Sequence, residues 1–144
     1  DRDRDRSERG FRLLPHTADV IVSAWAPTAS GCVEQAVRGL VAIFAEVTQD
    51  APTRPVPFAC DPDSDGELLV RVLEEVIYLV DAHDLVAVRA LVRRSPQGGL
   101  AGHFDALPLA TVTITGPAPK AIARHGLSFA ADGGRWRCTV TVDV

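Results

Sequence analysis

The chain has 144 residues, 47% of them apolar, which is enough for one domain with its own hydrophobic core. Its formal net charge of −4 excludes a protein that holds nucleic acid by summed positive charge, because phosphate neutralisation needs clustered lysine and arginine. The three cysteines lie far apart and form no C-x-x-C pair, which argues against a disulfide framework or a zinc knuckle and favours a reducing compartment.

The first ten residues differ in character from the rest of the chain. Residues 1–10 are a balanced string of opposite charges with nothing to bury, so we predict a disordered tail followed by a single domain over residues 11–144. No segment approaches the roughly 18 consecutive apolar residues of a membrane span, and the N-terminus has no apolar signal core. We therefore expect a cytoplasmic protein that does not contact membranes.

The first half of the domain predicts a strand, a helix and an edge strand. Apolar residues alternate over residues 18–26, which predicts a strand that Asp19 opens. Residues 53–60 have an extended pattern interrupted by two prolines, as an edge strand tolerates. Between them, apolar residues at helical spacing predict an amphipathic helix that begins near Thr28 or Ser30, namely Val33, Ala36, Val37, Leu40, Val41 and Phe44.

A second helix is predicted from Ser64 onwards. Ser64 and Glu67 have the spacing of a capping box, in which each side chain bonds the backbone amide of the other residue. The acidic run at residues 61–66 copies the opening of an EF-hand calcium loop, but its twelfth position is Val72. We therefore interpret the run as a solvated turn before a helix whose apolar stripe is Leu69, Val72, Leu73, Val76, Ile77 and Val80.

The second half of the domain is rich in short segments bounded by glycine or proline. We predict strands over residues 85–92, 99–106, 111–115, 120–129 and 135–144. Residues 81–84 offer metal-ligand types, but at a helix end they are better explained as caps or solvated groups. The predicted class is therefore α+β, with two amphipathic helices packed on a mixed, largely antiparallel sheet.

The last predicted strand ends in Asp143 and Val144. Alternation along this strand places Asp143 on its polar face. The Asp143 side chain and the Val144 carboxylate are two hard oxygen donors within reach of one Mg²⁺ or Ca²⁺. The alternative is an ordinary solvated chain end.

The segment His16-Thr17-Ala18-Asp19 stands where a loop becomes the first predicted strand. Alone, it is typical of a hydrogen-bonded turn. If Asp19 lay beside Asp143, the two carboxylates would repel each other unless a cation or a basic group sat between them. This interpretation requires the first and last predicted strands to be neighbours.

Lys120 is the single lysine among fifteen basic residues. We therefore hypothesise that position 120 requires a point-like ammonium group, which would bind a phosphate or a carboxylate. The alternative is that this lysine is present by chance. Together with Arg124 and His125, Lys120 forms a candidate basic patch. Common enzyme signatures such as G-x-S-x-G, the P-loop and H-E-x-x-H are absent from the sequence.

Taken together, several motifs resemble the archease family over residues 11–144. They are His16-Thr17-Ala18-Asp19-Val20, the second helix with Glu75, Tyr78-Leu79 and Asp81, the segment from Lys120-Ala121 to His125-Gly126-Leu127, and the closing strand to Val144. The chain departs from the family pattern at Pro119, at Ala123-Arg124 and at Leu73-Glu74-Glu75.

The resemblance implies a partner, which is the GTP-dependent ligase that joins RNA 3′-phosphate or 2′,3′-cyclic phosphate ends to 5′-hydroxyl ends in tRNA splicing and RNA repair. Archeases help that ligase guanylylate itself and turn over repeatedly. The resemblance therefore implies only an indirect association of this protein with RNA. The resemblance assigns a metal site to Asp19, Asp143 and Val144, and partner contacts to His16, Lys120 and His125. The implied cation is calcium, with magnesium or manganese as alternatives.

Two other functions remain open. The first is an independent metal-dependent phosphatase or nuclease, in which His16 or His125 would act as a general base beside the two aspartates. The second is a chaperone-like interaction module, for which Asp143 would be dispensable.

Overall fold

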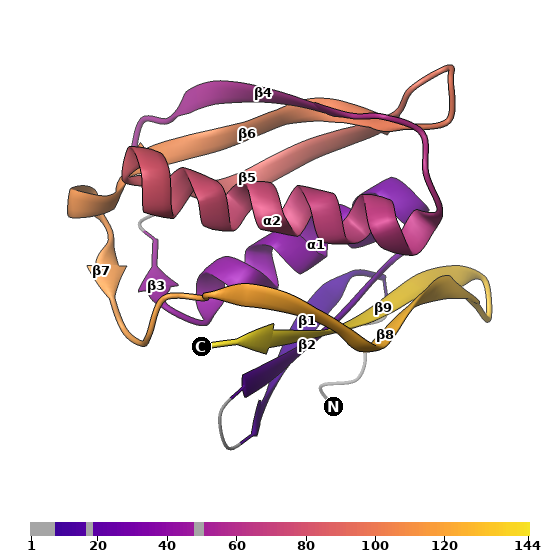
Figure 1. The fold of residues 1–144 in the computed structure, drawn as a ribbon, viewed down its shortest axis with the longest axis horizontal. Coiled ribbons are helices and arrows are strands. Elements are labelled where there is room, and N and C mark those ends of the chain that lie inside the picture. The colour runs from indigo at the N-terminus through magenta and orange to yellow at the C-terminus, as the bar shows by residue number, and fades with distance from the viewer. Residues whose placement is uncertain (1–7, 17–18, 48–50) are drawn as a thin grey trace.

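The computed structural model describes residues 8–16, 19–47 and 51–144. The chain forms two helices that lie between two antiparallel sheets, with a small third sheet at one side (Figure 1). The predicted α+β class is confirmed. Residues 1–7 of the predicted tail lie outside the described residues, and the first strand begins at Gly10.

Every strand pair in the described part of the chain is antiparallel. The four-stranded sheet has the order β1 (Gly10–His16), β2 (Asp19–Ala26), β9 (Arg135–Asp143) and β8 (Ala121–Asp132). The three-stranded sheet has the order β4 (Arg54–Cys60), β6 (Leu100–Pro108) and β5 (Leu85–Arg94). The third sheet pairs β3 (Ala45–Glu46) with β7 (Thr113–Ile114).

Helix α1 (Ala29–Ala42) begins where the sequence predicts it. The Thr28 hydroxyl accepts a hydrogen bond from the Gly31 N–H at 3.0 Å, which satisfies one free amide of the first turn. Close contact with β2 requires a glycine at position 39, because a Cβ there would lie 2.7 Å from Val22 Cγ1. The helix therefore rests directly on the four-stranded sheet.

Helix α2 (Asp65–His83) buries the predicted apolar stripe between the two sheets. It ends at Asp84, whose left-handed backbone (φ 52°) lets its N–H donate to the carbonyls of Leu79 and Val80. The interpretation of residues 81–84 as a helix end is confirmed. Neither helix of the described residues is long and apolar enough to cross a membrane.

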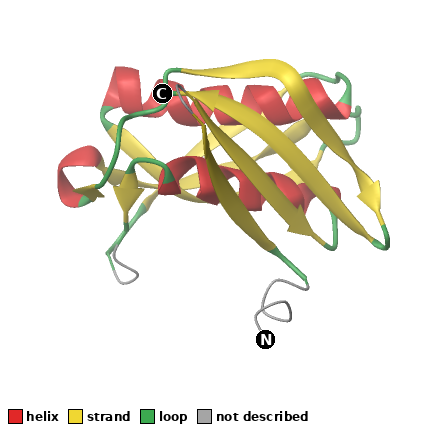
Figure 2. Ribbon diagram, turned by 90° about the horizontal axis from the view of Figure 1, so that it is seen from below, coloured by secondary structure: helices red, strands yellow, loops and turns green. Residues whose placement is uncertain are grey.

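The hydrophobic core fills the space between the two large sheets and the helices. On β9, Cys138, Val140 and Val142 are fully buried, Thr141 is buried at 6% exposure, and Asp143 is exposed. Figure 2, seen from the side of the four-stranded sheet, shows its strands spread beneath both helices. The burial pattern therefore fixes which face of each strand meets solvent.

The strands differ from the sequence-based prediction in several places. The strands divide into three sheets, where one sheet was expected. Strand β1 was missed, because Arg12 and Pro15 interrupt its apolar residues. The strand predicted over residues 111–115 is reduced to Thr113–Ile114 and follows a short 3₁₀ helix, η2 (Leu109–Thr111). The edge position predicted for residues 53–60 is confirmed by β4.

Candidate functional site

The candidate site lies at one end of the four-stranded sheet. Strand register places His16 opposite Asp19, Asp19 opposite Asp143, and Asp143 opposite Ala121. These four positions form a single row across β1, β2, β9 and β8. The prediction that the first and last predicted strands are neighbours is confirmed, and Asp19 and Asp143 are hereafter called the facing aspartates.

Burial sets the direction of the facing aspartates. Asp143 is exposed and Asp19 half-buried, whereas the next residue on β9, Val142, is fully buried. Register partners project to the same face of a sheet, and their Cβ atoms lie about 4.5–5.5 Å apart. Both carboxylates therefore project to the outer face of the sheet, close enough to repel each other or to bind one cation.

Lys120 meets this row through its backbone. Its N–H donates to the Asp143 carbonyl at 2.7 Å, immediately before β8 begins at Ala121. The preceding Pro119 is buried, so it fills an apolar position without disturbing the strand that follows. The Lys120 side chain is exposed at this end of the sheet. The structure thus brings Asp19, Asp143 and Lys120 together.

His125 lies apart from this row. The register between β8 and β9 shifts between Ala123 and Ser128, so His125 belongs to a bulge and is exposed. Gly126 allows the bulge, because its φ of 74° is strained for other residues. Thr17, Ala18 and the His16 side chain lie outside the described residues. His125 is therefore placed next to the row along β8, not within it.

The donor chemistry at this end of the sheet fits a hard divalent cation. Carboxylate and backbone oxygens are the ligands that calcium, magnesium and manganese prefer, whereas structural zinc sites use cysteine and histidine. Within residues 8–16, 19–47 and 51–144, no group of three or more His, Cys, Asp or Glu residues could hold a metal ion. The facing aspartates, with an oxygen of Val144, suit a partly open site in which other oxygens complete the coordination.

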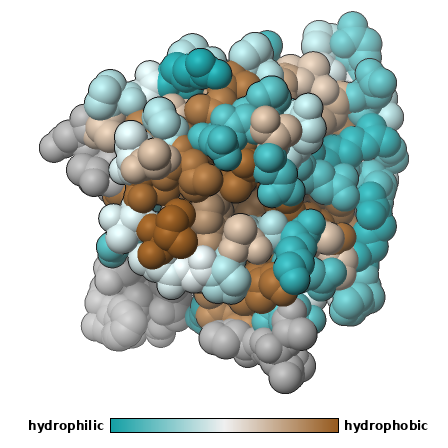
Figure 3. Space-filling model, turned by 60° about the vertical axis from the view of Figure 1, so that its left-hand side comes forward, coloured by the Kyte–Doolittle hydropathy of each residue, from teal (hydrophilic) through white to brown (hydrophobic). Residues whose placement is uncertain are grey.

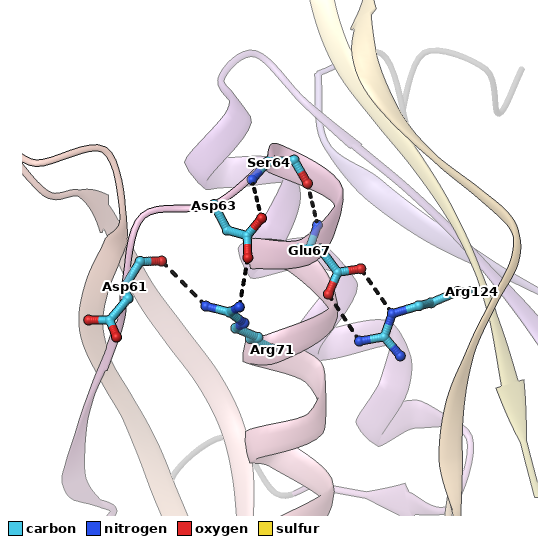
Figure 4. Close-up of polar contacts among 6 residues, drawn as sticks. All are labelled: Asp61, Asp63, Ser64, Glu67, Arg71 and Arg124. Carbon is cyan, nitrogen blue, oxygen red and sulfur yellow. Dashed lines mark hydrogen bonds and ion pairs between the residues drawn. The ribbon is translucent and has the colours of Figure 1, made fainter.

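The EF-hand-like run at residues 61–66 has a structural role (Figure 4). Asp63 accepts a hydrogen bond from the Ser64 N–H at 2.7 Å, and its other oxygen lies 2.6 Å from Arg71 Nη2. The Ser64 hydroxyl accepts from the Glu67 N–H at 3.3 Å. The interpretation of this run as a turn before the helix is confirmed.

The second half of the predicted capping box is wrong. The Glu67 carboxylate turns away from Ser64 and binds the Arg124 guanidinium with two contacts of 2.9 and 3.0 Å (Figure 4). Hydrogen bonding to Arg124 lowers the pKa of Glu67 below its ordinary value. Arg124, a departure from the family pattern, therefore ties the bulge of β8 to α2. The two residues are 57 positions apart in the sequence, so no local pattern could predict this pair.

The side of the molecule that carries the end of β9 also exposes apolar surface. Strands β3 and β7 lie on this side (Figure 1), and Figure 3 shows apolar side chains gathered across the middle of the face with hydrophilic ones at its margins. Ile114 of β7 is 54% exposed. Exposed apolar surface of this kind suits a protein partner. Sequence analysis missed Ile114, because one isoleucine between threonines carries no distinguishing pattern.

The sequence matches the archease protein family over residues 11–144. A Mycobacterium tuberculosis protein named probable protein archease is 40% identical over 135 residues, which cover 94% of this chain and 75% of that protein. An Aeropyrum pernix protein archease is 31% identical over 77 residues, or 54% of each chain. The family match therefore spans both the facing aspartates and Lys120.

Solved structures with the same fold are more distant in sequence. The solution structure of a Methanobacterium thermoautotrophicum protein superimposes with a TM-score of 0.68 at 18% identity, covering 94% of this chain and 99% of the other. The crystal structure of an archease from Thermotoga maritima, described as a possible chaperone, gives a TM-score of 0.64 at 16% identity and covers 92% and 96% of the two chains. These structures share the fold, and the sequence match establishes that the chain belongs to the archease family.

Proposed function

We propose that this protein activates a GTP-dependent RNA ligase that joins 3′-phosphate or 2′,3′-cyclic phosphate ends to 5′-hydroxyl ends. It would do so by holding a divalent cation between the facing aspartates and by promoting guanylylation and repeated turnover of the ligase. The family membership supports the accessory role, and the register of Asp19 opposite Asp143 is the observation that carries the cation site.

Each group at this end of the sheet has a defined task in the proposal. The two carboxylates hold the cation, together with an oxygen of Val144. The hydrogen bond from Lys120 N–H to the Asp143 carbonyl fixes the end of β9 and so orients the Asp143 side chain. The Lys120 ammonium is available for a phosphate of the ligase-bound nucleotide. When bound, the cation would supply positive charge that stabilises negative charge developing during nucleotidyl transfer.

The protein supplies only some of the oxygen ligands that the cation needs. This favours a site that presents the cation to a partner over one that holds it permanently. Magnesium is commonly held by one or two carboxylates and completes its shell with water and phosphate oxygens, whereas calcium takes about six to eight oxygens. Calcium is the cation implied by family resemblance, and magnesium or manganese fits the same donors. Two aspartates on one exposed sheet end leave coordination positions for a partner or its substrate.

The test is a ligation time course with an RNA ligase of this class present in limiting amount. Wild-type protein should convert a single round of ligation into repeated turnover, and Asp19→Ala should abolish this effect while the fold is retained. Asp105→Ala, which removes an aspartate from the three-stranded sheet, is the matched control and should activate normally. Undiminished activation by Asp19→Ala would remove the proposal.

The same assay separates the two alternatives. Cleavage or dephosphorylation of RNA by the purified protein without ligase would favour an independent hydrolase. Binding of ligase and of unrelated proteins alike, with no loss in Asp143→Ala, would favour the chaperone-like module that the description of the Thermotoga maritima structure suggests for that protein.

A further inference from the structure

A second candidate binding site lies between the edge strand β4 and helix α2. An open groove of about 480 Å³ is lined by residues 58–61 on one side and by Arg71, Glu74, Glu75 and Tyr78 on the other. The four helical residues follow i, i+3, i+4, i+7 spacing, so they form one stripe beside the stripe that enters the core. The volume falls in the range of about 300–1,000 Å³ that is common for ligand sites.

The open edge of β4 limits how a partner can bind. Within the part of the chain that the structure describes, strand β4 pairs only with β6, so alternate residues of β4 present their backbone groups to solvent. Pro55 and Pro57 have no N–H and must occupy these outward positions, because a proline cannot donate within the sheet. An added strand would therefore lack two donors. Backbone pairing along β4 is therefore weakened, and a partner of this groove gains more from side-chain contacts.

Aromatic rings give the groove one part of its chemistry. The Phe58 ring stacks on the buried Phe104 ring with centroids 4.6 Å apart, which fixes Phe58 in place. Tyr78 is 53% exposed and makes an edge contact with His83 at 5.4 Å. Exposed aromatic faces attract guanidinium and ammonium groups.

Unpaired carboxylates give the groove its charge. Arg71 is held at one end by the Asp63 carboxylate and the Asp61 carbonyl, and the Asp61 carboxylate points away from it (Figure 4). Among the described residues, Glu74 and Glu75 form no ion pair with a basic side chain. Burial raises the pKa of the Cys60 thiol, the charge of Arg71 opposes this effect, and the charges of Glu75 and Asp61 add to it. The walls therefore carry an excess of negative charge.

We propose that this groove docks a basic segment of a protein partner, whose arginine or lysine side chain lies against Tyr78 and meets the carboxylates of Glu74 and Glu75. An acidic or phosphorylated segment is disfavoured by repulsion from these carboxylates. A purely apolar segment would cover them without pairing them, which is unfavourable. The inference does not depend on cation binding by the facing aspartates.

The test is an NMR titration of the ¹⁵N-labelled full chain with an acetylated, amidated Leu-Arg-Leu-Arg-Leu peptide. Saturable shifts should concentrate at residues 58–61 and 71–78. The same peptide with citrulline in place of arginine keeps the shape but loses the charge, and it should produce no saturable shifts. The double variant Glu74→Gln/Glu75→Gln should weaken binding about tenfold, since both rim charges are removed.

Two further variants make the outcome decisive. Glu46→Gln removes an exposed carboxylate outside the groove and should bind the arginine peptide as the wild type does. If the double glutamine variant fails to fold, Tyr78→Ala, which alters an exposed side chain, should still weaken binding. Equal shifts with the citrulline peptide, shifts scattered over the surface, or equal losses in Glu46→Gln and the groove variants would overturn the proposal.

Discussion

Each large sheet holds a pair of facing charged residues that can be compared, since one pair has opposite charges and the other has like charges. In the three-stranded sheet, Arg89 faces Asp105, with Nε and Oδ2 2.9 Å apart. In the four-stranded sheet, Asp19 faces Asp143. Opposite charges in this geometry stabilise a sheet by about 0.2–1 kcal/mol, whereas like charges destabilise it by a similar amount.

The contrast sets a structural ion pair beside the pair at which we propose cation binding. Arg89 and Asp105 satisfy each other, and His103 Nε2 lies 3.5 Å from the second Asp105 oxygen, so this pair needs no ligand. Two aspartates in the same geometry gain stability when a cation lies between them. Like charges directly opposite each other destabilise a sheet, and a cation bound as we propose would offset that cost.

The substitution with the strongest consequence replaces the like-charge pair of the four-stranded sheet by an opposite-charge pair. Asp143→Arg removes one carboxylate and places a guanidinium opposite Asp19, so cation affinity should fall by roughly 100-fold or more, because affinity follows the number of charged ligands. Isothermal titration with calcium and with manganese measures this effect. Retained affinity in Asp143→Arg would mean that the cation binds elsewhere.

The reverse change should disturb the three-stranded sheet. Arg89→Glu replaces the ion pair by two facing carboxylates, and the free energy of unfolding should fall by about 1 kcal/mol. Urea unfolding measures the change. Arg93→Glu on the same strand is the matched control, because Arg93 is exposed and faces Ala101. The control should stay close to the wild-type stability, and equal losses in both variants would contradict the pairing argument.

The smallest expected effect concerns the ion pair between Glu67 and Arg124, which joins α2 to the bulge of β8. Because Arg124 lowers the pKa of Glu67 in the folded protein, the pair stabilises the fold at neutral pH. That contribution should be lost as the pH falls below the ordinary Glu value of 4.5 and through the lowered pKa. The unfolding midpoints of wild type and Glu67→Gln should differ slightly at pH 7 and converge in acid. A difference that grows in acid would contradict the sign.

Periodic patterns made much of this fold predictable from sequence. The alternation from Asp19 and the alternation that ends at Asp143 predicted both strands, and the second also predicted the face of Asp143. Their pairing is a long-range contact that neither pattern encodes. It was an assumption of the sequence analysis, and the family resemblance implied it by assigning both aspartates to one metal site. Local sequence therefore predicted the elements and the candidate ligands, and the fold supplied their proximity.

The failures of prediction share a physical cause. Strand β1 has a short and interrupted apolar pattern, so its place is set by pairing with β2 rather than by its own sequence. Glu67 has the right spacing for a capping box, but a bidentate contact with a distant arginine is stronger than the expected bond to a backbone amide. Tertiary contacts decided both cases, and local patterns do not contain them.

The number of cations bound per chain tests whether the facing aspartates share one ion. The wild-type protein should bind one calcium, manganese or magnesium ion per chain, as measured by isothermal titration after removal of bound metal. Asp19→Asn and Asp143→Asn should each lose this binding, and the double variant should bind no more weakly than either single variant, because both carboxylates serve one ion. Wild-type affinity in either single variant, with its fold intact, would contradict a shared site.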